Sequence, residues 1–315
     1  MKGMIALGAL AMAAAVAADA WPRDDAETMV RHETGQAFRP VATKVLSRRE
    51  AAQARLGEAL FADPRLSGKG TRACVSCHDL ATNGASARAN DLAPDGRALA
   101  FNTPTVFNAA TSFRLNWEGR FRSLETQARR SIENPAIMGG DPGVVASRLG
   151  ADPAIRSQFV AAFGRDPNAE DVAAALARFE TTLITPDARF DRYLRGDTAA
   201  LEPQALRGYR LFQSAGCSSC HQGVNIGGNL FQRSGVFHTL TDPRAPIMRV
   251  PSLRNVETTA PYFHDGSART LEDAIRAMGR SQLNRVLTPA QVDDIAAFLR
   301  SLTGQYRGRS VRARE

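Results

Sequence analysis

Apolar residues recur at helical spacing in several separate parts of the chain. The first such part opens with Ser47 and Glu50, the pattern of a capping box, in which two side chains satisfy free backbone N–H groups at a helix start. The helix that follows is predicted to turn Leu56, Leu60 and Phe61 inward. This pattern predicts an amphipathic helix packed against a core.

Three more helices follow from the same reasoning. One carries Val172, Leu176, Phe179 and Leu183 on its apolar face and stops before Pro186. A short one is expected from Thr270 to Met278, with Leu271, Ala274 and Ile275 on its apolar side. The last helix is expected to start after the cap Thr288, with Pro289 at its first position and Gln291 as the capping-box partner, and to end at Gly304. Its inward-facing residues are Val292, Ile295, Phe298, Leu299 and Leu302. No long alternating stretch predicts a sheet, so the fold class is all-α with much loop.

The apolar pattern occurs twice. Leu56-Gly57-x-x-Leu60-Phe61 is matched by Arg207-Gly208-x-x-Leu211-Phe212, and the closing helix through Leu176 and Phe179 by the one through Ile295 and Phe298. Self-similarity of this kind predicts two like domains. We assign them to residues 21–195 and 203–304, with a linker within 187–202 and a basic tail, 305–315, that is expected to fray.

The first twenty residues have the pattern of a secretory signal peptide. Lys2 gives a positive start, an Ala/Leu/Met-rich stretch runs from Ile5 to Val16, and Ala18-Asp19-Ala20 resembles a cleavage site. A membrane anchor is the weaker alternative, because the apolar run is shorter than the ~20 residues that a span needs. No other segment is long and apolar enough to cross a membrane. Residues 1–20 are therefore predicted to be a signal peptide for export to a periplasm.

The composition is that of a folded protein, with 43% hydrophobic and 23% charged residues, which excludes wholesale disorder. The net charge is +8, almost all of it from Arg, because Lys2, Lys44 and Lys69 are the only lysines. Aromatic residues are 7%, and no dense basic run precedes the tail, so nucleic-acid binding is not expected. The positive charge is expected either to keep the protein soluble or to attract an acidic partner.

All four cysteines stand in two C-x-x-C-H motifs, Cys74 to His78 and Cys217 to His221. This is the attachment pattern of c-type haem. Two thiols two residues apart can each add to one vinyl group of a porphyrin, and the next residue, His, then lies under the iron. Zinc is the main alternative, but the cysteine pairs are 140 residues apart, and paired zinc ligands are usually much closer. We therefore predict two covalently attached haems, Cys74 and Cys77 holding one and Cys217 and Cys220 the other.

Each haem iron needs a fifth ligand and can take a sixth. His78 and His221 supply the fifth ligands. Met278, 57 residues after His221, is predicted to be the sixth ligand of the second haem. Met138, 60 residues after His78, is its counterpart in the first half. Met138 could bind the first iron, or it could line an open pocket.

With these motifs the chain resembles the bacterial di-haem cytochrome c peroxidase and MauG family over nearly all of the mature length. The matching stretches are Leu60-Phe61-x-Asp63-Pro64-Arg65-Leu66-Ser67-Gly68, Asn102-Thr103-Pro104-Thr105, Trp117-Glu118-Gly119-Arg120, Gly223-Val224-Asn225-x-Gly227-Gly228, Pro251-Ser252-Leu253-Arg254-Asn255, Pro261-Tyr262-Phe263-His264-x-Gly266 and Met278-Gly279.

The resemblance implies a division of labour. Peroxide reacts at the N-terminal haem on His78, and electrons arrive through the C-terminal haem on His221 and Met278. Trp117 carries electron coupling between the haems, although a packing role is the alternative. His264 matches a histidine near the haems that is not an axial ligand.

The resemblance also implies further partners. Asn102, Thr259 and Pro261 match a calcium site of the family, and oxygen ligands suit that hard cation. The expected substrate is hydrogen peroxide. The expected electron donor is a small periplasmic protein, either a c-type cytochrome or a cupredoxin. The protein could also form a homodimer.

Two departures from the family pattern bear on activity. Many relatives have a histidine in the loop after the first haem motif, which blocks the peroxide-reactive haem, but residues 79–101 contain none. The family usually has a Glu before the methionine that matches Met138, and this chain has Ile137 there. That Glu moves a proton between the peroxide oxygens, which isoleucine cannot do. Glu133 is close in sequence, but Pro135 intervenes.

These observations favour a periplasmic cytochrome c peroxidase. The first alternative is a di-haem electron-transfer or sensor protein whose peroxidase activity is weakened by Ile137. The second is MauG-like oxidation of another substrate, which Met278 disfavours because the resemblance puts Tyr at that position in MauG-type enzymes.

Overall fold

The structure is a computed structural model that describes residues 37–241 and 247–314. The predicted signal peptide, residues 1–20, lies outside these ranges. The helices are α2 (Arg48–Phe61), α3 (Leu124–Glu133), α4 (Pro142–Gly150), α5 (Pro153–Phe163), α6 (Ala169–Glu180), α7 (Arg189–Leu194), α8 (Pro203–Ser214), α9 (Leu271–Leu283) and α10 (Pro289–Arg300). The strands are β1 (Phe231–Arg233), β2 (Ile247–Arg249), β3 (Gln305–Tyr306) and β4 (Arg309–Ser310).

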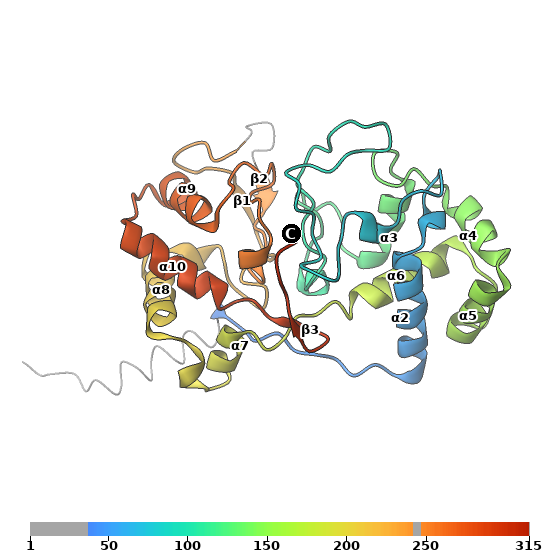
Figure 1. The fold of residues 1–315 in the computed structure, drawn as a ribbon, viewed down its shortest axis with the longest axis horizontal. Coiled ribbons are helices and arrows are strands. Elements are labelled where there is room, and N and C mark those ends of the chain that lie inside the picture. Colours follow the sequence, from blue (N-terminus) through green and yellow to red (C-terminus); the bar gives the residue numbers. More distant parts are fainter. Residues whose placement is uncertain (1–36, 242–246, 315) are drawn as a thin grey trace, which may run out of the picture. The chain divides into compact units, whose positions relative to one another are not determined.

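Helices dominate, as the sequence predicts, and within residues 37–241 and 247–314 the strands form two short antiparallel pairs, β1 with β2 and β3 with β4 (Figure 1). The pairs were not foreseen because two or three residues are too few to show an alternating pattern. Within the described residues, none of the helices has the length and apolar character needed to cross a membrane.

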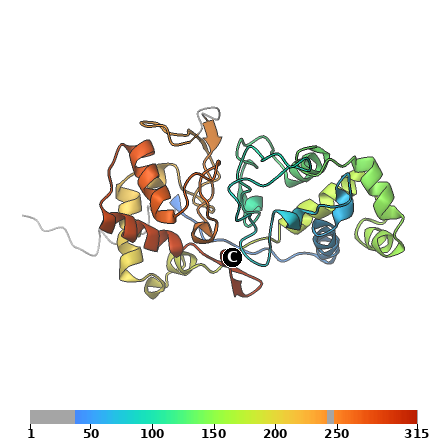
Figure 2. The same cartoon turned by 45° about the horizontal axis from the view of Figure 1, so that its top comes forward.

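The internal repeat is visible as two equivalent helix pairs. In the first half α2 packs on α6, and in the second half α8 packs on α10 (Figures 1 and 2). In each pair the two helices approach each other closely at a glycine. A Cβ at Gly57 would lie 1.9 Å from the carbonyl oxygen of Ala175, and a Cβ at Gly208 would lie 1.8 Å from that of Asp294. Only glycine therefore lets the two backbones approach this closely.

Each helix pair forms one hydrophobic core. In the first half Leu56, Leu60 and Phe61 of α2 are buried against Leu176 and Phe179 of α6, as predicted. The second core is built from α8, α10 and the residues just after α10, and it contains Tyr209, Phe212, Val292, Ile295, Phe298, Leu299 and Leu302.

The predicted helix starts are confirmed. Ser47 and Glu50 form a complete capping box at the start of α2. Thr288 and Gln291 form another at the start of α10, with Pro289 at the first helical position. The helix that begins after Thr270 does not end at Met278, however. It continues to Leu283, because Gly279 is accommodated inside the helix and the left-handed cap falls at Asn284.

The tail, which we expected to fray, is folded. Strands β3 and β4 form a hairpin, and the Tyr306 ring packs on Phe107, with centroids 4.8 Å apart. Val311 is buried in the core of the first half, and Arg307 pairs with Glu58 at 2.8 Å. The reason for the difference is that the tail finds its apolar partners far away in sequence.

The predicted linker, 187–202, is likewise structured. It contains α7, whose Phe190 is fully buried in the second core together with Phe38. The segment at residues 37–41 thus joins the core of the second half, and the tail joins that of the first.

A network of buried amides joins the halves. The Asn108 side chain donates to Thr185 Oγ1 at 2.6 Å, and the Asn255 side chain donates to the same oxygen at 2.9 Å. Asn225 reaches across to the carbonyl of Asn108 at 3.2 Å. All four side chains are buried, and each buried polar group that finds a partner avoids a desolvation cost of about 1–3 kcal/mol.

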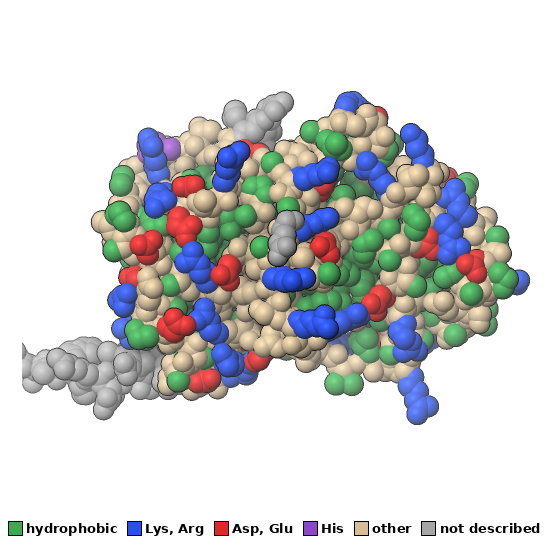
Figure 3. Space-filling view, in the orientation of Figure 1, with side chains coloured by type: hydrophobic (Ala, Val, Ile, Leu, Met, Phe, Trp, Pro, Cys, Tyr) green, Lys and Arg blue, Asp and Glu red, His purple; other side chains and the backbone are tan. Residues whose placement is uncertain are grey.

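The basic charge is spread over the surface. On the face shown in Figure 3, Arg side chains alternate with Asp and Glu side chains rather than forming one continuous patch. Many of them are paired at the surface, as in Arg156 with Asp166 and Arg207 with Asp294.

Candidate active site

A single continuous cavity is lined by both C-x-x-C-H motifs. Its volume is about 1420 Å³. This exceeds the roughly 300–1,000 Å³ of an ordinary small-molecule pocket. Its wall includes all four cysteines, His78 and His221. The space and its lining fit two large apolar cofactors.

Each motif has the same local conformation. A short 3₁₀-helix covers Cys74–Ser76 in the first motif and Cys217–Ser219 in the second. The His78 N–H donates to the Cys74 carbonyl at 2.9 Å, and the His221 N–H donates to the Cys217 carbonyl at 3.0 Å. The turn therefore presents two thiols and one imidazole to the cavity. The four thiols are free of disulfide bonds, as covalent haem attachment requires.

The two histidines are held in the tautomer that binds a metal. His78 Nδ1 lies 3.0 Å from the Gly84 carbonyl, and His221 Nδ1 lies 3.3 Å from the Ile226 carbonyl. A carbonyl only accepts, so Nδ1 carries the proton and Nε2 has its lone pair available. Burial lowers the pKa of His221 to about 4 and also lowers that of His78, which keeps both rings neutral.

The two candidate methionine ligands both line the cavity, in different settings. Met278 is half-buried within α9. Met138 is buried and also belongs to the core of the first half. It sits in a turn after α3, where the Asn134 carbonyl accepts from the N–H groups of Ile137, Met138 and Gly139.

Ile137 and Glu133, the residues in question for proton transfer, also line the cavity. Ile137 is 37% exposed. Glu133 accepts from Arg129 Nε at 2.9 Å and from an Arg130 terminal nitrogen at 2.7 Å. These guanidinium groups hold the pKa of Glu133 below its usual range, so the carboxylate has no proton to give at neutral pH.

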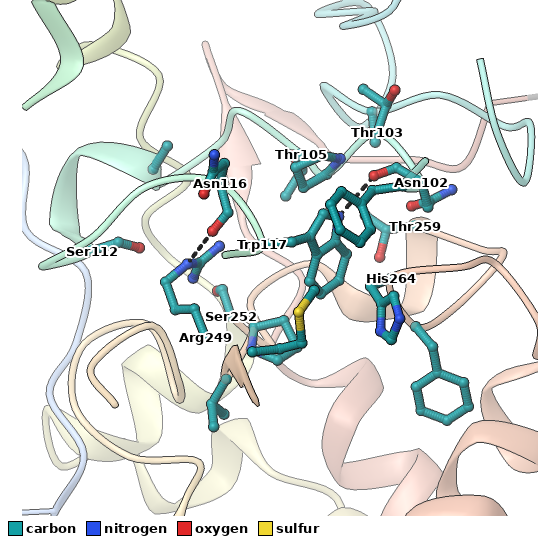
Figure 4. A pocket seen from close by; sticks show the side chains of 18 of the residues that line it. Asn102, Thr103, Thr105, Ser112, Asn116, Trp117, Arg249, Ser252, Thr259 and His264 are labelled. Atoms are coloured by element: carbon teal, nitrogen blue, oxygen red, sulfur yellow. Dashed lines mark hydrogen bonds between the residues drawn. The ribbon is translucent and has the colours of Figure 1, made fainter. Parts of the chain in front are cut away.

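Trp117 and His264 meet in the cavity wall. Their ring centroids are 6.3 Å apart in an edge-on arrangement (Figure 4). The Trp117 indole N–H donates to the Asn102 carbonyl at 2.8 Å, and the Asn102 N–H donates to the His264 carbonyl at 2.7 Å. His264 is buried, with Nδ1 3.3 Å from Thr241 Oγ1. The two aromatic side chains therefore tie a loop of the first half to a loop of the second.

These two residues are also equivalent in the internal repeat. An isolated bridge joins Leu115 to Phe121 around Trp117, and another joins Tyr262 to Ala268 around His264. Trp117 and His264 are 147 residues apart in sequence, which is also the distance between Leu115 and Tyr262. The sequence repeat was found in the helices, the haem motifs and the two methionines, and this constant offset is the signal that would have extended it to these two loops.

The calcium candidates Asn102, Thr259 and Pro261 all lie in the cavity wall. The Asn102 amide nitrogen donates to the carbonyls of Arg88 and Ala89 at 2.9 and 3.1 Å, which leaves its amide oxygen available as a ligand. Their donor set is made of neutral oxygens. Within the described residues there is no cluster of three or more His, Cys, Asp or Glu that could hold a metal ion.

Arg249 was missed by the sequence analysis. Its guanidinium is buried, lines the cavity and donates through Nε to the Asn116 carbonyl at 2.9 Å (Figure 4). Burial lowers its pKa to about 10, and no carboxylate of the described residues pairs with it. A buried cation needs an anion, and the propionate groups of a haem supply one. This side chain therefore fits a haem in the cavity.

Comparison with known proteins identifies the family. The pattern of the di-haem cytochrome c peroxidases matches residues 51–199, and that of cytochrome c matches residues 205–303. The chain is 39% identical over 276 residues to the cytochrome c551 peroxidase of Nitrosomonas europaea, covering 83% of each protein. It is 36% identical over 292 residues to the cytochrome c551 peroxidase of Pseudomonas aeruginosa, covering 85% of this chain and 84% of that protein.

A solved structure of a similar protein supports the same family assignment. A MauG-like protein associated with microbial copper homeostasis superposes with a TM-score of 0.71 at 28% identity, over 85% of this chain and 93% of that one. The chain therefore belongs to the di-haem cytochrome c peroxidase and MauG family. Its mainly helical fold is that of two cytochrome c domains, and it carries two c-type haems, as predicted from its two motifs.

Proposed function

We propose that this protein is a cytochrome c peroxidase that reduces hydrogen peroxide with electrons from a small redox protein. The observation that carries the proposal is one cavity lined by two C-x-x-C-H motifs, in a chain 39% identical to a cytochrome c551 peroxidase. In the reaction the O–O bond breaks, two electrons and two protons are taken up, and two waters form. The haems supply the electron transfer and the site at which peroxide binds.

The two halves have different roles in this proposal. The first half, whose core is formed by α2 and α6, holds the haem on His78 where peroxide reacts. The C-terminal domain, 203–304, holds the haem on His221 and Met278, which accepts electrons from the donor. A thioether ligand raises haem potential, which suits the electron-accepting site. The location of Met278 in the cavity wall supports its assignment as ligand.

Trp117 and His264 are our candidates for coupling the two haems. They line the cavity, and their rings are in edge contact where loops of the two halves meet. The hydrogen bond from Trp117 to Asn102 fixes the indole and favours a coupling role over simple packing.

The sixth position of the N-terminal haem is open to peroxide in this proposal. Residues 79–101 contain no histidine that could block it. Met138 is the competing ligand, but it is buried in the first core, where its packing accounts for its position.

The remaining partners follow from the family. We propose a c-type cytochrome or a cupredoxin as donor, a periplasmic location after removal of residues 1–20, and calcium held by Asn102, Thr259 and Pro261. Homodimer formation is compatible with these assignments.

One observation favours a second candidate function. Ile137 replaces the acid that relatives use to move the peroxide proton. A di-haem electron carrier or sensor would need no such acid. MauG-like oxidation of another substrate is the third candidate function. The superposition on a MauG-like protein supports it, and Met278 opposes it because MauG-type enzymes resemble this chain but have Tyr at that position.

A steady-state assay separates these candidates. The holoprotein, matured with both haems attached, is mixed with hydrogen peroxide and a reduced small c-type cytochrome. We expect donor oxidation that depends on peroxide, with two donor molecules oxidised per peroxide consumed. Donor oxidation that is indifferent to peroxide, with ready reduction of both haems, would identify an electron carrier instead.

A further inference from the structure

Three carboxyl side chains are found among the described residues that line the cavity: Glu118, Glu133 and Glu180. The first two are ion-paired. Glu118 accepts from Arg120 at 2.7 Å, and Glu133 is held by two arginines. The two arginines hold the pKa of Glu133 below its usual range, so this carboxylate has no proton to donate at neutral pH.

Glu180 is different. It is the last residue of α6 and is 6% exposed. Within residues 37–241 and 247–314, no side chain forms an ion pair with it and no group donates a hydrogen bond to its carboxyl. Burial, together with repulsion from Glu125 at the start of α3, raises the pKa of Glu180 to about 8. Its carboxyl group therefore holds a proton at pH 7.

The internal repeat shows that this acid is peculiar to the first half. Glu180 follows Phe179 in α6, and the equivalent residue after Phe298 in α10 is Leu299. Both Glu180 and Leu299 line the cavity. An apolar residue thus fills this position beside the second motif. A buried acid in its place carries a desolvation penalty, which packing alone does not explain.

Glu180 lies on the side of the first haem motif. Cys74 packs against the core of the first half, to which Leu176 and Phe179 of α6 belong, and both Cys74 and Glu180 line the cavity. Helix α6 also packs on α3, the helix that leads to Ile137. Cys74 is one of the two attachment points of the N-terminal haem. The carboxyl group therefore lies in the part of the cavity wall that belongs to the first haem motif.

We propose that Glu180 is the proton donor of the peroxide pocket, and that it does from α6 what relatives do with the acid that Ile137 has replaced. This inference rests on the proposed peroxidase function. Glu180 gives its proton to the departing oxygen as the O–O bond breaks, and that oxygen leaves as the first water. The other oxygen takes up the two electrons and a second proton from solvent, and leaves as the second water. The two electrons come from the reduced donor protein through the haems, and Glu180 regains a proton from solvent before the next turnover.

The test compares Glu180→Gln and Glu180→Leu with Glu133→Gln as the matched control. Leucine is the residue that the second half uses at this position, so it suits the packing. We expect both Glu180 variants to turn over peroxide ~10²–10⁴-fold more slowly than wild type, the usual contribution of a positioned proton donor. Glu133→Gln should stay near the wild-type rate. Reduction of the C-terminal haem by the donor should be the same in all four proteins.

Two further experiments test the role of Glu180. The first is a spectrum that does not depend on turnover, and the second is a double variant that should recover part of the lost turnover. The infrared spectrum of the wild-type holoprotein at pH 7 should contain a protonated-carboxyl C=O band that shifts in heavy water and is missing in Glu180→Gln. Adding Ile137→Glu to Glu180→Gln should recover part of the lost rate, because it returns an acid to the position used by relatives.

The outcomes are distinct. Glu180→Gln turning over as fast as wild type, or an infrared spectrum identical in the two proteins, would overturn the role of Glu180 and leave the peroxidase function intact. A wild-type holoprotein that does not turn over peroxide would instead overturn the proposed function, and this role with it.

Discussion

Replacing Met278 with histidine is expected to lower the reduction potential of one haem and leave the other unchanged. An imidazole is a stronger donor than a thioether and stabilises the oxidised iron. Since axial ligands set haem potentials over a range of ~0.8 V, the shift should be a sizeable fraction of that range. A redox titration followed by absorbance measures it. The weak near-infrared band of His/Met ligation should disappear in the same variant.

The cavity provides a matched control for this experiment. Met248 also lines the cavity and is buried in β2, but it matches no ligand position in the sequence. Met248→Leu should keep the near-infrared band and both potentials close to those of wild type. If Met278→His leaves both potentials and the band unchanged, Met278 packs against its neighbours and does not bind iron.

The second large effect is expected at Gly208, where α8 crosses α10. A Cβ there would lie 1.8 Å from the Asp294 carbonyl oxygen and 2.4 Å from its carbon, and these backbone atoms cannot move without shifting the helix. Gly208→Ala should therefore destabilise the protein by about 1–3 kcal/mol or more, as overpacking does. Gly57→Ala, at the equivalent crossing of α2 and α6, should behave in the same way.

Denaturant unfolding of the holoprotein measures these changes. Gly150→Ala is the control, because Gly150 lies in α4 and an added Cβ would meet only Pro167, at 3.8 Å. That variant should be stabilised by up to about 0.5–1 kcal/mol, since alanine is the better helix former. A Gly208→Ala protein as stable as Gly150→Ala would show that the helices can separate at little cost.

Local patterns predicted the helices well. The caps at Ser47 and Thr288 depend on residues within one turn, so their sequence motifs were sufficient. The haem motifs are equally local, because two cysteines and one histidine lie within five residues. The prediction for the end of α9 was wrong, because the helix continues through Gly279 to Leu283 and ends at the left-handed residue Asn284.

Features that depend on distant partners were not predictable. The tail folds because Tyr306 packs on Phe107 and Arg307 forms an ion pair with Glu58. These partners are far from the tail in sequence, so no local pattern predicts the contacts. The ion pairs of Glu133 are local, because Arg129 and Arg130 precede it at i,i+4 and i,i+3 helical spacing. The burial of Glu180 without an ion pair depends instead on residues that are distant in sequence.

The central claim, that two haems in one cavity reduce peroxide by two electrons, is tested most directly by a single-turnover experiment. The fully reduced holoprotein is mixed with one equivalent of hydrogen peroxide, and both haems are followed by rapid-scan absorbance. The account predicts that one peroxide reoxidises both haems, with the electron of the C-terminal haem leaving through the N-terminal one. If both haems stay reduced, or reoxidise no faster than free haem does with the same peroxide, the account is contradicted.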